Sequence, residues 1–329
     1  MRLNYRLVLA LGVAVAFAAI SATPADAVLL YKSAIRNKTA PTGAEANSGW
    51  QYQGHWSNGF EGIPIAPHYF ITASHVGGNP GAAIWFRGTN YTTTNQYDDP
   101  NTDLRIYKVS GTFPAYAQLY TKTDEVGKLA TVFGRGTGRG TDVKVGTSLK
   151  GWQWAALDKV ESWGDNNVAG LKDFGAGYGT FLDFKFDRTG TANEAALSNG
   201  DSGGGVFIKD GTTWKLAGVN YLVDGPFAKT AGGATFMASI FDKGGLYVSN
   251  SPVTDTAADV PGNWYATSIS RRISWINSII GVPPKSATFS TSSAIASDVS
   301  SVPEPLGGTI ILLCGALMAT RRSRRAVMH

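Results

Sequence analysis

Short runs of apolar, β-branched and aromatic residues, separated by glycine, asparagine and aspartate, extend over most of this 329-residue chain. Forty glycines and many threonines and valines accompany them. Runs of this length and composition, bounded by turn-forming residues, are typical of β-strands. We therefore expect an all-β domain, with representative strands at residues 82–86, 180–184 and 214–219.

The segment NGDSGGG at residues 199–205 places a serine after Gly-Asp and before three glycines. Glycine allows backbone turns that other residues resist, so two N–H groups can point at the space beside the serine hydroxyl. Such a loop suits a nucleophile whose attack creates an oxyanion. A surface turn would have a similar composition, so the segment alone leaves both interpretations open.

A serine hydroxyl needs an adjacent base, which is itself held by a third group. Four histidines are available. His55 lies in a polar stretch, His68 in a predicted turn, and His329 ends the chain. His75 ends the apolar run 69–75, which predicts a strand, and a strand end is a rigid support for a base. A purely structural histidine at a strand end is the alternative.

The third group should be a carboxylate with apolar residues behind it, because the orienting aspartate works best when buried. Asp103 precedes such a run at residues 104–109. Asp98 and Asp99 compete with it, but they lie in a polar turn before a proline. The cluster superficially resembles a calcium loop; however, it lacks the central glycine, and its twelfth position is Val109 instead of glutamate.

These three segments resemble the trypsin/chymotrypsin family of serine proteases: TASH at 72–75, NTDL at 101–104 and GDSGG at 200–204. The order His, Asp, Ser matches that family and differs from the order in subtilisins and in α/β-hydrolases. His75 and Asp103 are 28 residues apart, and Asp103 and Ser202 are 99 residues apart. These separations fit a two-barrel enzyme with a short first barrel. Residues 265–276 resemble the family's last strand and closing helix, whose apolar face would dock on the second barrel. The resemblance covers about residues 45–282.

The resemblance implies an all-β fold of two antiparallel β-barrels with a C-terminal helix, and it implies no metal and no cofactor. His75 would accept the proton of Ser202, and Asp103 would orient the imidazole. The backbone N–H groups of Gly200 and Ser202 would form the oxyanion hole.

The family's spacing also suggests a specificity pocket. Ala196, six residues before Ser202, would lie at its base. Without a carboxylate there, a basic substrate side chain would be buried unpaired, which is costly. Apolar or small side chains are therefore expected before the cut, unless Glu194 or Asp224 reaches in.

The chain also departs from the family's pattern. Ser74 stands where alanine is usual, a small-for-small exchange that we expect to be neutral. Gly205 replaces the usual proline and should loosen the loop slightly. Activated relatives pair a new N-terminal amine with the residue equivalent to Asp201, yet no Val-Gly-Gly segment precedes His75. Val28 lies 47 residues before His75, close to the family's spacing, so its amine could reach Asp201.

Two other features have non-catalytic interpretations. The glycine-rich residues 134–140 lack the Gly-Lys-Ser/Thr of a phosphate loop and a following helix pattern, so we expect a mobile loop. The nine tryptophans could stack on carbohydrate, but packing in the core and loops is the favoured interpretation.

Residues 1–27 are expected to form a secretory signal peptide. Two arginines, an apolar stretch at 7–20 and the A-x-A site Ala25-Asp26-Ala27 precede Val28. Signal peptidase is therefore an expected partner. A retained membrane anchor is the alternative, although the apolar stretch is short and the cleavage site is well formed.

The other end of the chain begins with a segment that predicts a flexible linker, residues 283–302, which hold seven serines and two threonines. Pro303-Glu304-Pro305, an apolar stretch at 306–320 and an arginine cluster follow. These features resemble the PEP-CTERM sorting signal of Gram-negative bacteria, which an exosortase-type membrane transpeptidase recognises. A helix of that stretch would rise about 22 Å, short of a hydrocarbon core of about 30 Å. This length suits a transient transmembrane segment; a permanent tail anchor is the alternative.

The formal net charge of +5 comes mostly from the two ends. Without them, 23 basic and 22 acidic residues nearly balance, so no nucleic acid partner is expected. The single cysteine, Cys314, lies in the apolar tail. The exported domain must therefore be stable without an internal disulfide, which a core of this size allows.

We divide the chain into a signal peptide (1–27), a trypsin-like serine protease domain (28–282), a linker (283–302) and a sorting signal with a transmembrane segment (303–329). The expected protein is an exported serine endopeptidase of a Gram-negative cell envelope, membrane-tethered before C-terminal processing, with a protein or peptide substrate. Two alternatives remain: a non-catalytic peptide- or matrix-binding protein on the same scaffold, and an esterase with the same catalytic residues.

Overall fold

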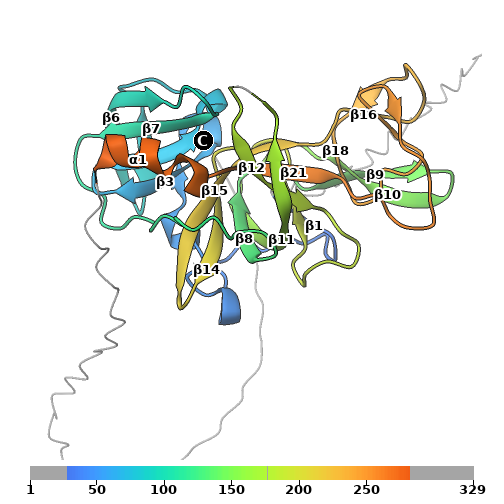
Figure 1. Cartoon of the computed structure of the whole chain (residues 1–329), viewed down its shortest axis with the longest axis horizontal. Helices are drawn as coiled ribbons and strands as arrows, with labels where there is room; N and C mark the ends of the chain where they lie inside the picture. Colours follow the sequence, from blue (N-terminus) through green and yellow to red (C-terminus); the bar gives the residue numbers. More distant parts are fainter. Residues whose placement is uncertain (1–27, 176, 282–329) are drawn as a thin grey trace, which may run out of the picture. The chain divides into compact units, whose positions relative to one another are not determined.

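The computed structural model describes residues 28–175 and 177–281, and Figure 1 shows them as a coloured ribbon. The expected signal peptide, linker and sorting signal lie outside the described residues. Twelve strands close into two antiparallel barrels of six strands each, as the sequence predicted. Strands were expected at 82–86, 180–184 and 214–219, and they are β5, β12 and β15.

The first barrel has the order β2-β3-β4-β7-β6-β5, and these strands cover, in that order, Gly54–His55, Glu61–Ala66, Tyr69–Ala73, Leu104–Val109, Thr89–Asp98 and Ala83–Phe86. The second has the order β11-β12-β21-β15-β14-β8, covering Ser162–Asp173, Thr180–Lys185, Asn263–Ser268, Thr213–Val223, Gly205–Asp210 and Leu129–Gly134. Closure leaves these strands without free edges, which protects them from pairing with other chains.

The pleat of the strands explains the barrel cores. In β5, Ile84 and Phe86 are buried while the residues between and before them are exposed. Alternate side chains of a strand point to opposite faces, so one face fills the barrel. On β7, Leu104 and Ile106 lie on the inner face and are fully buried. This burial fixes the register of β7 against β4 and thus the position of the residues at their ends.

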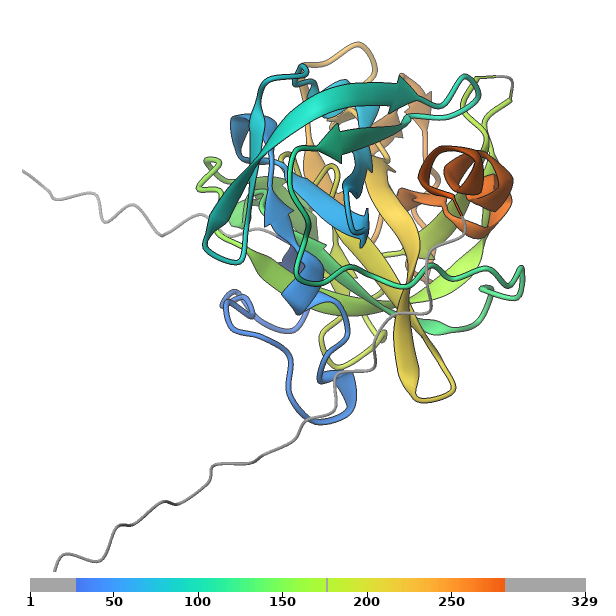
Figure 2. The ribbon, with the colours of Figure 1, turned by 90° about the vertical axis from the view of Figure 1, so that its left-hand side faces the viewer.

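The chain closes with α1 (Ile273–Ile280), which ends at Gly281 with φ +72°. Its Ile276 is buried in a cluster that includes core residues of the first barrel. Arg272, just before the helix, pairs with Asp99 between β6 and β7. The helix was expected to dock on the second barrel, and the cluster around Ile276 includes residues of that barrel. This cluster and the ion pair also hold the helix beside the first barrel (Figure 2).

Two small sheets outside the barrels form an accessory lobe that the sequence did not predict. The hairpin of β9 (Arg139–Val145) and β10 (Ser148–Trp154) pairs with β18 (Ala238–Ile240). A second small sheet has the order β17-β16-β19-β20, covering Thr235–Phe236, Phe227–Ala228, Tyr247–Val248 and Ser251–Pro252. Val143, Phe227, Ala238, Ile240 and Leu246 form its own small core.

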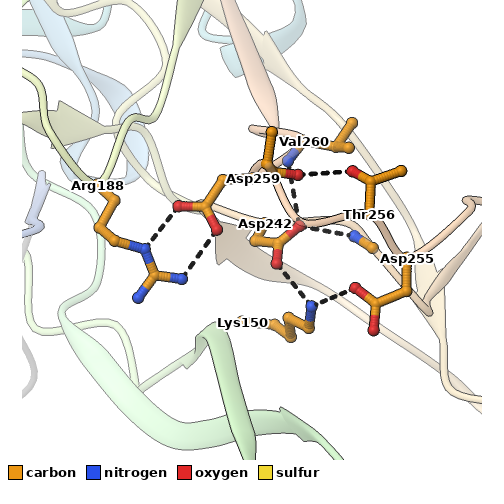
Figure 3. Close-up of polar contacts among 9 residues, drawn as sticks. Lys150, Arg188, Asp242, Asp255, Thr256, Asp259 and Val260 are labelled. Atoms are coloured by element: carbon orange, nitrogen blue, oxygen red, sulfur yellow. Dashed lines mark hydrogen bonds and ion pairs between the residues drawn. The ribbon is translucent and has the colours of Figure 1, made fainter.

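Ion pairs of Asp242, Asp255 and Asp259 hold the loops of this lobe that contain these residues (Figure 3). The Lys150 ammonium is nearly buried and lies 2.6 Å from Asp242 Oδ2 and 2.8 Å from Asp255 Oδ1. Arg188, from outside the lobe, pairs with Asp259 through two hydrogen bonds. If Asp242 and Asp255 were removed, the nearly buried ammonium of Lys150 would have no compensating charge, which is costly. We therefore infer that the ion pairs of Lys150 fix the loop.

The first described residues contact both strand β13 (Ala195–Ala196) and the accessory lobe. β1 (Leu29–Leu30) pairs with β13. The Arg139 guanidinium donates hydrogen bonds to the carbonyl oxygens of Leu30 and Tyr31, and it lies over the Trp152 ring at 3.7 Å. Leu29 and Leu30 also belong to the hydrophobic cluster of the second barrel, so both this barrel and the lobe hold the N-terminal strand.

Short 3₁₀ helices are η1 (Gly43–Glu45), η2 (Trp50–Tyr52), η3 (Ser57–Gly59), η4 (Ser74–Val76) and η5 (Ser270–Arg272). Within the described part of the chain, no helix has both the length and the apolar character that spanning a membrane requires. The predicted transmembrane stretch at 306–320 lies outside that part.

Candidate active site

His75 and Asp103 meet because their strands pair. β4 and β7 pair antiparallel, with Ala73 opposite Leu104. His75 follows β4 within η4, and Asp103 immediately precedes β7. Asp103 Oδ2 lies 2.5 Å from His75 Nδ1, and its Oδ1 accepts a hydrogen bond from the His75 backbone N–H at 3.0 Å. The carboxylate therefore fixes the orientation of the imidazole ring.

Ser202 completes the arrangement from the second barrel. Its Oγ lies 2.8 Å from His75 Nε2, across 127 residues of sequence. The loop before β14 presents it: Gly200 and Gly203 have φ of +100° and +82°, which side-chain-bearing residues rarely adopt. The Gly203 N–H donates to the Asn220 carbonyl on β15 at 3.1 Å. The structure thus brings together the three predicted side chains in the order carboxylate, imidazole, hydroxyl.

Asp201 holds the same loop from the opposite side. Its carboxylate is fully buried and accepts hydrogen bonds from the backbone N–H groups of Ser198 and Gly136, both at 2.7 Å. The Val28 N–H also donates to it, at 3.4 Å. Burial raises the pKa of Asp201 to about 6, although these donors act in the opposite direction.

This network corrects the expectation of a mobile loop at residues 134–140. Residues 136–138 are buried, and β9 already begins at Arg139. A Cβ atom on Gly136 would lie 2.4 Å from Ser198 Oγ, so the glycine is needed for close approach to the Asp201 loop. Only the tertiary contact distinguishes this segment from a flexible glycine-rich loop.

The predicted oxyanion donors, Gly200 and Ser202, lie on either side of Asp201. Within residues 28–175 and 177–281, neither backbone N–H donates to a protein acceptor. The Gly205 N–H, where the family has proline, donates to Gln53 Oε1 at 3.3 Å. Gly205 consequently anchors the loop, contrary to the expected loosening.

Ala196, the predicted base of the specificity pocket, lines a cavity of about 10 Å³. Leu197, Val223, Asp224 and Asn263 also line it. Such a volume holds about one water molecule. Val223 of β15 lines this cavity, and the ring of Tyr221 on the same strand lies edge-on to His75, with the ring centroids 5.5 Å apart.

Neither carboxylate that could have made this cavity acidic is available. Asp224 pairs with Lys243 of the accessory lobe at 2.8 Å and accepts a hydrogen bond from the Asn263 N–H at 3.0 Å. Glu194 is buried and accepts hydrogen bonds from Asn166, the Asp187 N–H and Thr191. Burial nevertheless raises the pKa of Glu194 to about 7.

Sequence reasoning missed two polar groups beside the site. The Ser74 hydroxyl, expected to be neutral, donates to Asp103 Oδ1 at 2.6 Å. Glu61 is fully buried behind the serine loop: a Cβ on Gly204 would lie 2.5 Å from its Oε2. Gly204 was a possible sequence signal for this buried carboxylate, because a glycine leaves space for a close neighbour.

No protein-family model matches the sequence, and no curated protein matches it. Among solved structures, the chain is similar to neuropsin, a serine protease expressed in the limbic system of mouse brain. The two are 14% identical, the TM-score is 0.43, and the match covers 71% of this chain and 96% of neuropsin.

Proposed function

We propose that this protein is a serine endopeptidase that hydrolyses peptide bonds through an acyl-enzyme. The observation that supports it most is the continuous contact from Asp103 through His75 to Ser202, at 2.5 Å and 2.8 Å. A hydroxyl, an imidazole and a carboxylate in this order form an activated nucleophile, and the Asp103 carboxylate is partly buried.

In the proposed mechanism, Ser202 Oγ attacks the substrate carbonyl carbon while its proton passes to His75 Nε2. The carbonyl oxygen becomes an oxyanion, which the N–H groups of Gly200 and Ser202 stabilise. His75 then gives the proton to the leaving amine as the carbon–nitrogen bond breaks. A water molecule, deprotonated by His75, hydrolyses the acyl-enzyme and restores Ser202. Asp103 stays ionised and stabilises the imidazolium.

We propose small side chains before the cleaved bond. The cavity beside Ala196 is small, and Asp224 is already neutralised by Lys243. A lysine or arginine of the substrate would find neither space nor a free carboxylate there.

The place of action is part of the proposal, and it rests on the sequence alone. Signal peptidase would release the N-terminus at Val28, and an exosortase-type transpeptidase would process the C-terminal signal. The enzyme would then act at the envelope or outer surface of a Gram-negative cell.

A fluorophosphonate probe tests the nucleophile without knowledge of the substrate. We expect labelling of wild-type protein at Ser202, and a loss of about 10⁴-fold or more in Ser202→Ala and His75→Ala with little change in folding. An unlabelled but folded wild-type protein would instead indicate the non-catalytic binding protein. Peptide-library profiling of a labelled enzyme then separates peptidase from esterase, and dominant cleavage after lysine or arginine would contradict the proposed pocket.

A further inference from the structure

The carboxylate of Asp103 has a side-chain partner besides the histidine. Ser74 Oγ donates to Asp103 Oδ1 at 2.6 Å, while His75 provides one donor to each carboxylate oxygen. Among the described residues, no other side chain donates to this carboxylate. Without the Ser74 hydroxyl, the Asp103 carboxylate would be held only by His75, the residue that it must itself orient.

The position of Ser74 is itself fixed at two points. It is the first residue of η4, directly after β4. Its backbone N–H donates to the Asp103 carbonyl oxygen at 2.7 Å, so main chain and side chain both bind the same residue. A short side chain attached in this way has little freedom, and its hydroxyl is pre-organised toward Oδ1.

We infer that Ser74 is a positioning residue, which holds the Asp103 carboxylate in the one orientation that aligns His75 with Ser202. This inference rests on the proposed function of that site. Hydrogen bonds to an ionised carboxylate are among the stronger ones in proteins, so the hydroxyl restricts rotation of the carboxylate. Ser74 touches neither Ser202 nor the reacting atoms, and it acts through Asp103.

The test compares four proteins in fluorophosphonate labelling: wild type, Ser74→Ala, Ser74→Cys and Ser74→Thr. Loss of a hydrogen bond to a charged group corresponds to an effect of about 10- to 100-fold. We expect Ser74→Ala and the nearly isosteric Ser74→Cys to lower the maximal inactivation rate by about this factor, with the probe's half-saturating concentration unchanged. Ser74→Thr retains the hydroxyl and should restore most of the rate.

A second readout follows the hydrogen bond itself. The low-field proton resonance of the His75 Nδ1–H group reports its contact with Asp103 Oδ2. It should move or broaden in Ser74→Ala and Ser74→Cys and return in Ser74→Thr. Ser270→Ala is the matched control, because it removes a serine hydroxyl from a different buried carboxylate, Glu125. This control should label at the wild-type rate.

The outcomes separate this inference from the proposed function. Absence of wild-type labelling contradicts the proposed function. If the wild type is labelled but Ser74→Ala reacts at the same rate with an unchanged resonance, Ser74 does not position Asp103. Equal loss in folded Ser74→Ala and Ser74→Thr would also overturn the inference, because the hydroxyl would not be the group that matters.

Discussion

Glu61 occupies the space behind the serine loop that a side chain at position 204 would fill. Both of its carboxylate oxygens are buried, and neither has a hydrogen-bond partner among the described residues. Burial, then the nearby Glu161, raises the pKa of Glu61 well above 4.5. An unpaired carboxylate is costly in such a place, so this group is held as the neutral acid.

The raised pKa of Glu61 gives a stability that depends on pH. The folded protein retains a proton that the unfolded chain loses above about 4.5. The contribution of Glu61 to the free energy of unfolding is therefore complete below that pH, and it is lost as the pH rises through the pKa of Glu61 in the folded protein. We expect Glu61→Gln to raise Tm by about 2–4 °C or more at pH 8, with little change at pH 4.

Thermal unfolding at the two pH values measures this effect. Glu45→Gln serves as the control, because Glu45 is only half-buried, and it should leave Tm nearly unchanged at both. A Glu61→Gln protein that is equally or less stable than wild type at pH 8 would show that Glu61 ionises without cost.

At the scale of strands and loops, local sequence patterns predicted the positions of several strands and of the serine loop. One apolar run of the sequence ends at His75 and contains β4, and another begins after Asp103 and forms β7. The ends of these runs therefore pointed to two of the candidate site residues. The serine loop was recognisable because the positive φ angles at Gly200 and Gly203 are conformations that favour glycine. The resemblance supplied the two barrels and the order of the three groups.

The accessory lobe was not predictable in this way. Its strand β18 pairs with β10, more than 80 residues earlier in the chain, and covers only three residues. Pairings of such short segments depend on tertiary burial, here of Val143 and Ile240. The Ser74 hydroxyl was overlooked for a related reason, since its value lies in a contact with a residue 29 positions away.

The N-terminal strand carries a prediction about Asp201. The Val28 nitrogen is buried 3.4 Å from Asp201 Oδ2, and a free ammonium there would favour the charged carboxylate. With a peptide nitrogen, Asp201 keeps a pKa of about 6, so its stabilising contribution is lost as the pH rises from 3.8 through 6. We expect protein that begins at Val28 to retain its Tm from pH 5 to pH 8 better than protein that retains Ala27.

The comparison uses thermal unfolding and fluorophosphonate labelling of both forms at pH 5 and pH 8. The form with Ala27 should lose stability and labelling rate at pH 8. Parallel profiles for the two forms would show that the amine does not act on Asp201, and that Ser198 and Gly136 suffice to hold the loop.

For the whole molecule, the two predicted signals decide where the proposed peptidase works. The described domain closes with α1, and a predicted linker of 20 residues follows it. A flexible chain of that length has a root-mean-square span of about 25 Å. An uncut tail would keep the domain about this far from the membrane and limit it to substrates at that surface, whereas cleavage after Pro305 would remove this limit.

Mass spectrometry of the protein from its native host tests the processing at both ends. In the mature surface fraction we expect an N-terminal peptide that begins at Val28, because Ala25-Asp26-Ala27 is a well-formed cleavage site. We also expect no peptide that crosses Pro305 into residues 306–320, since a span of about 22 Å is too short for a stable anchor. Intact peptides across Pro305 in that fraction would establish a permanent tail anchor, and peptides from residues 1–27 would establish a retained signal. Either finding would confine the enzyme to the membrane surface, so the same measurement also decides which substrates it can reach.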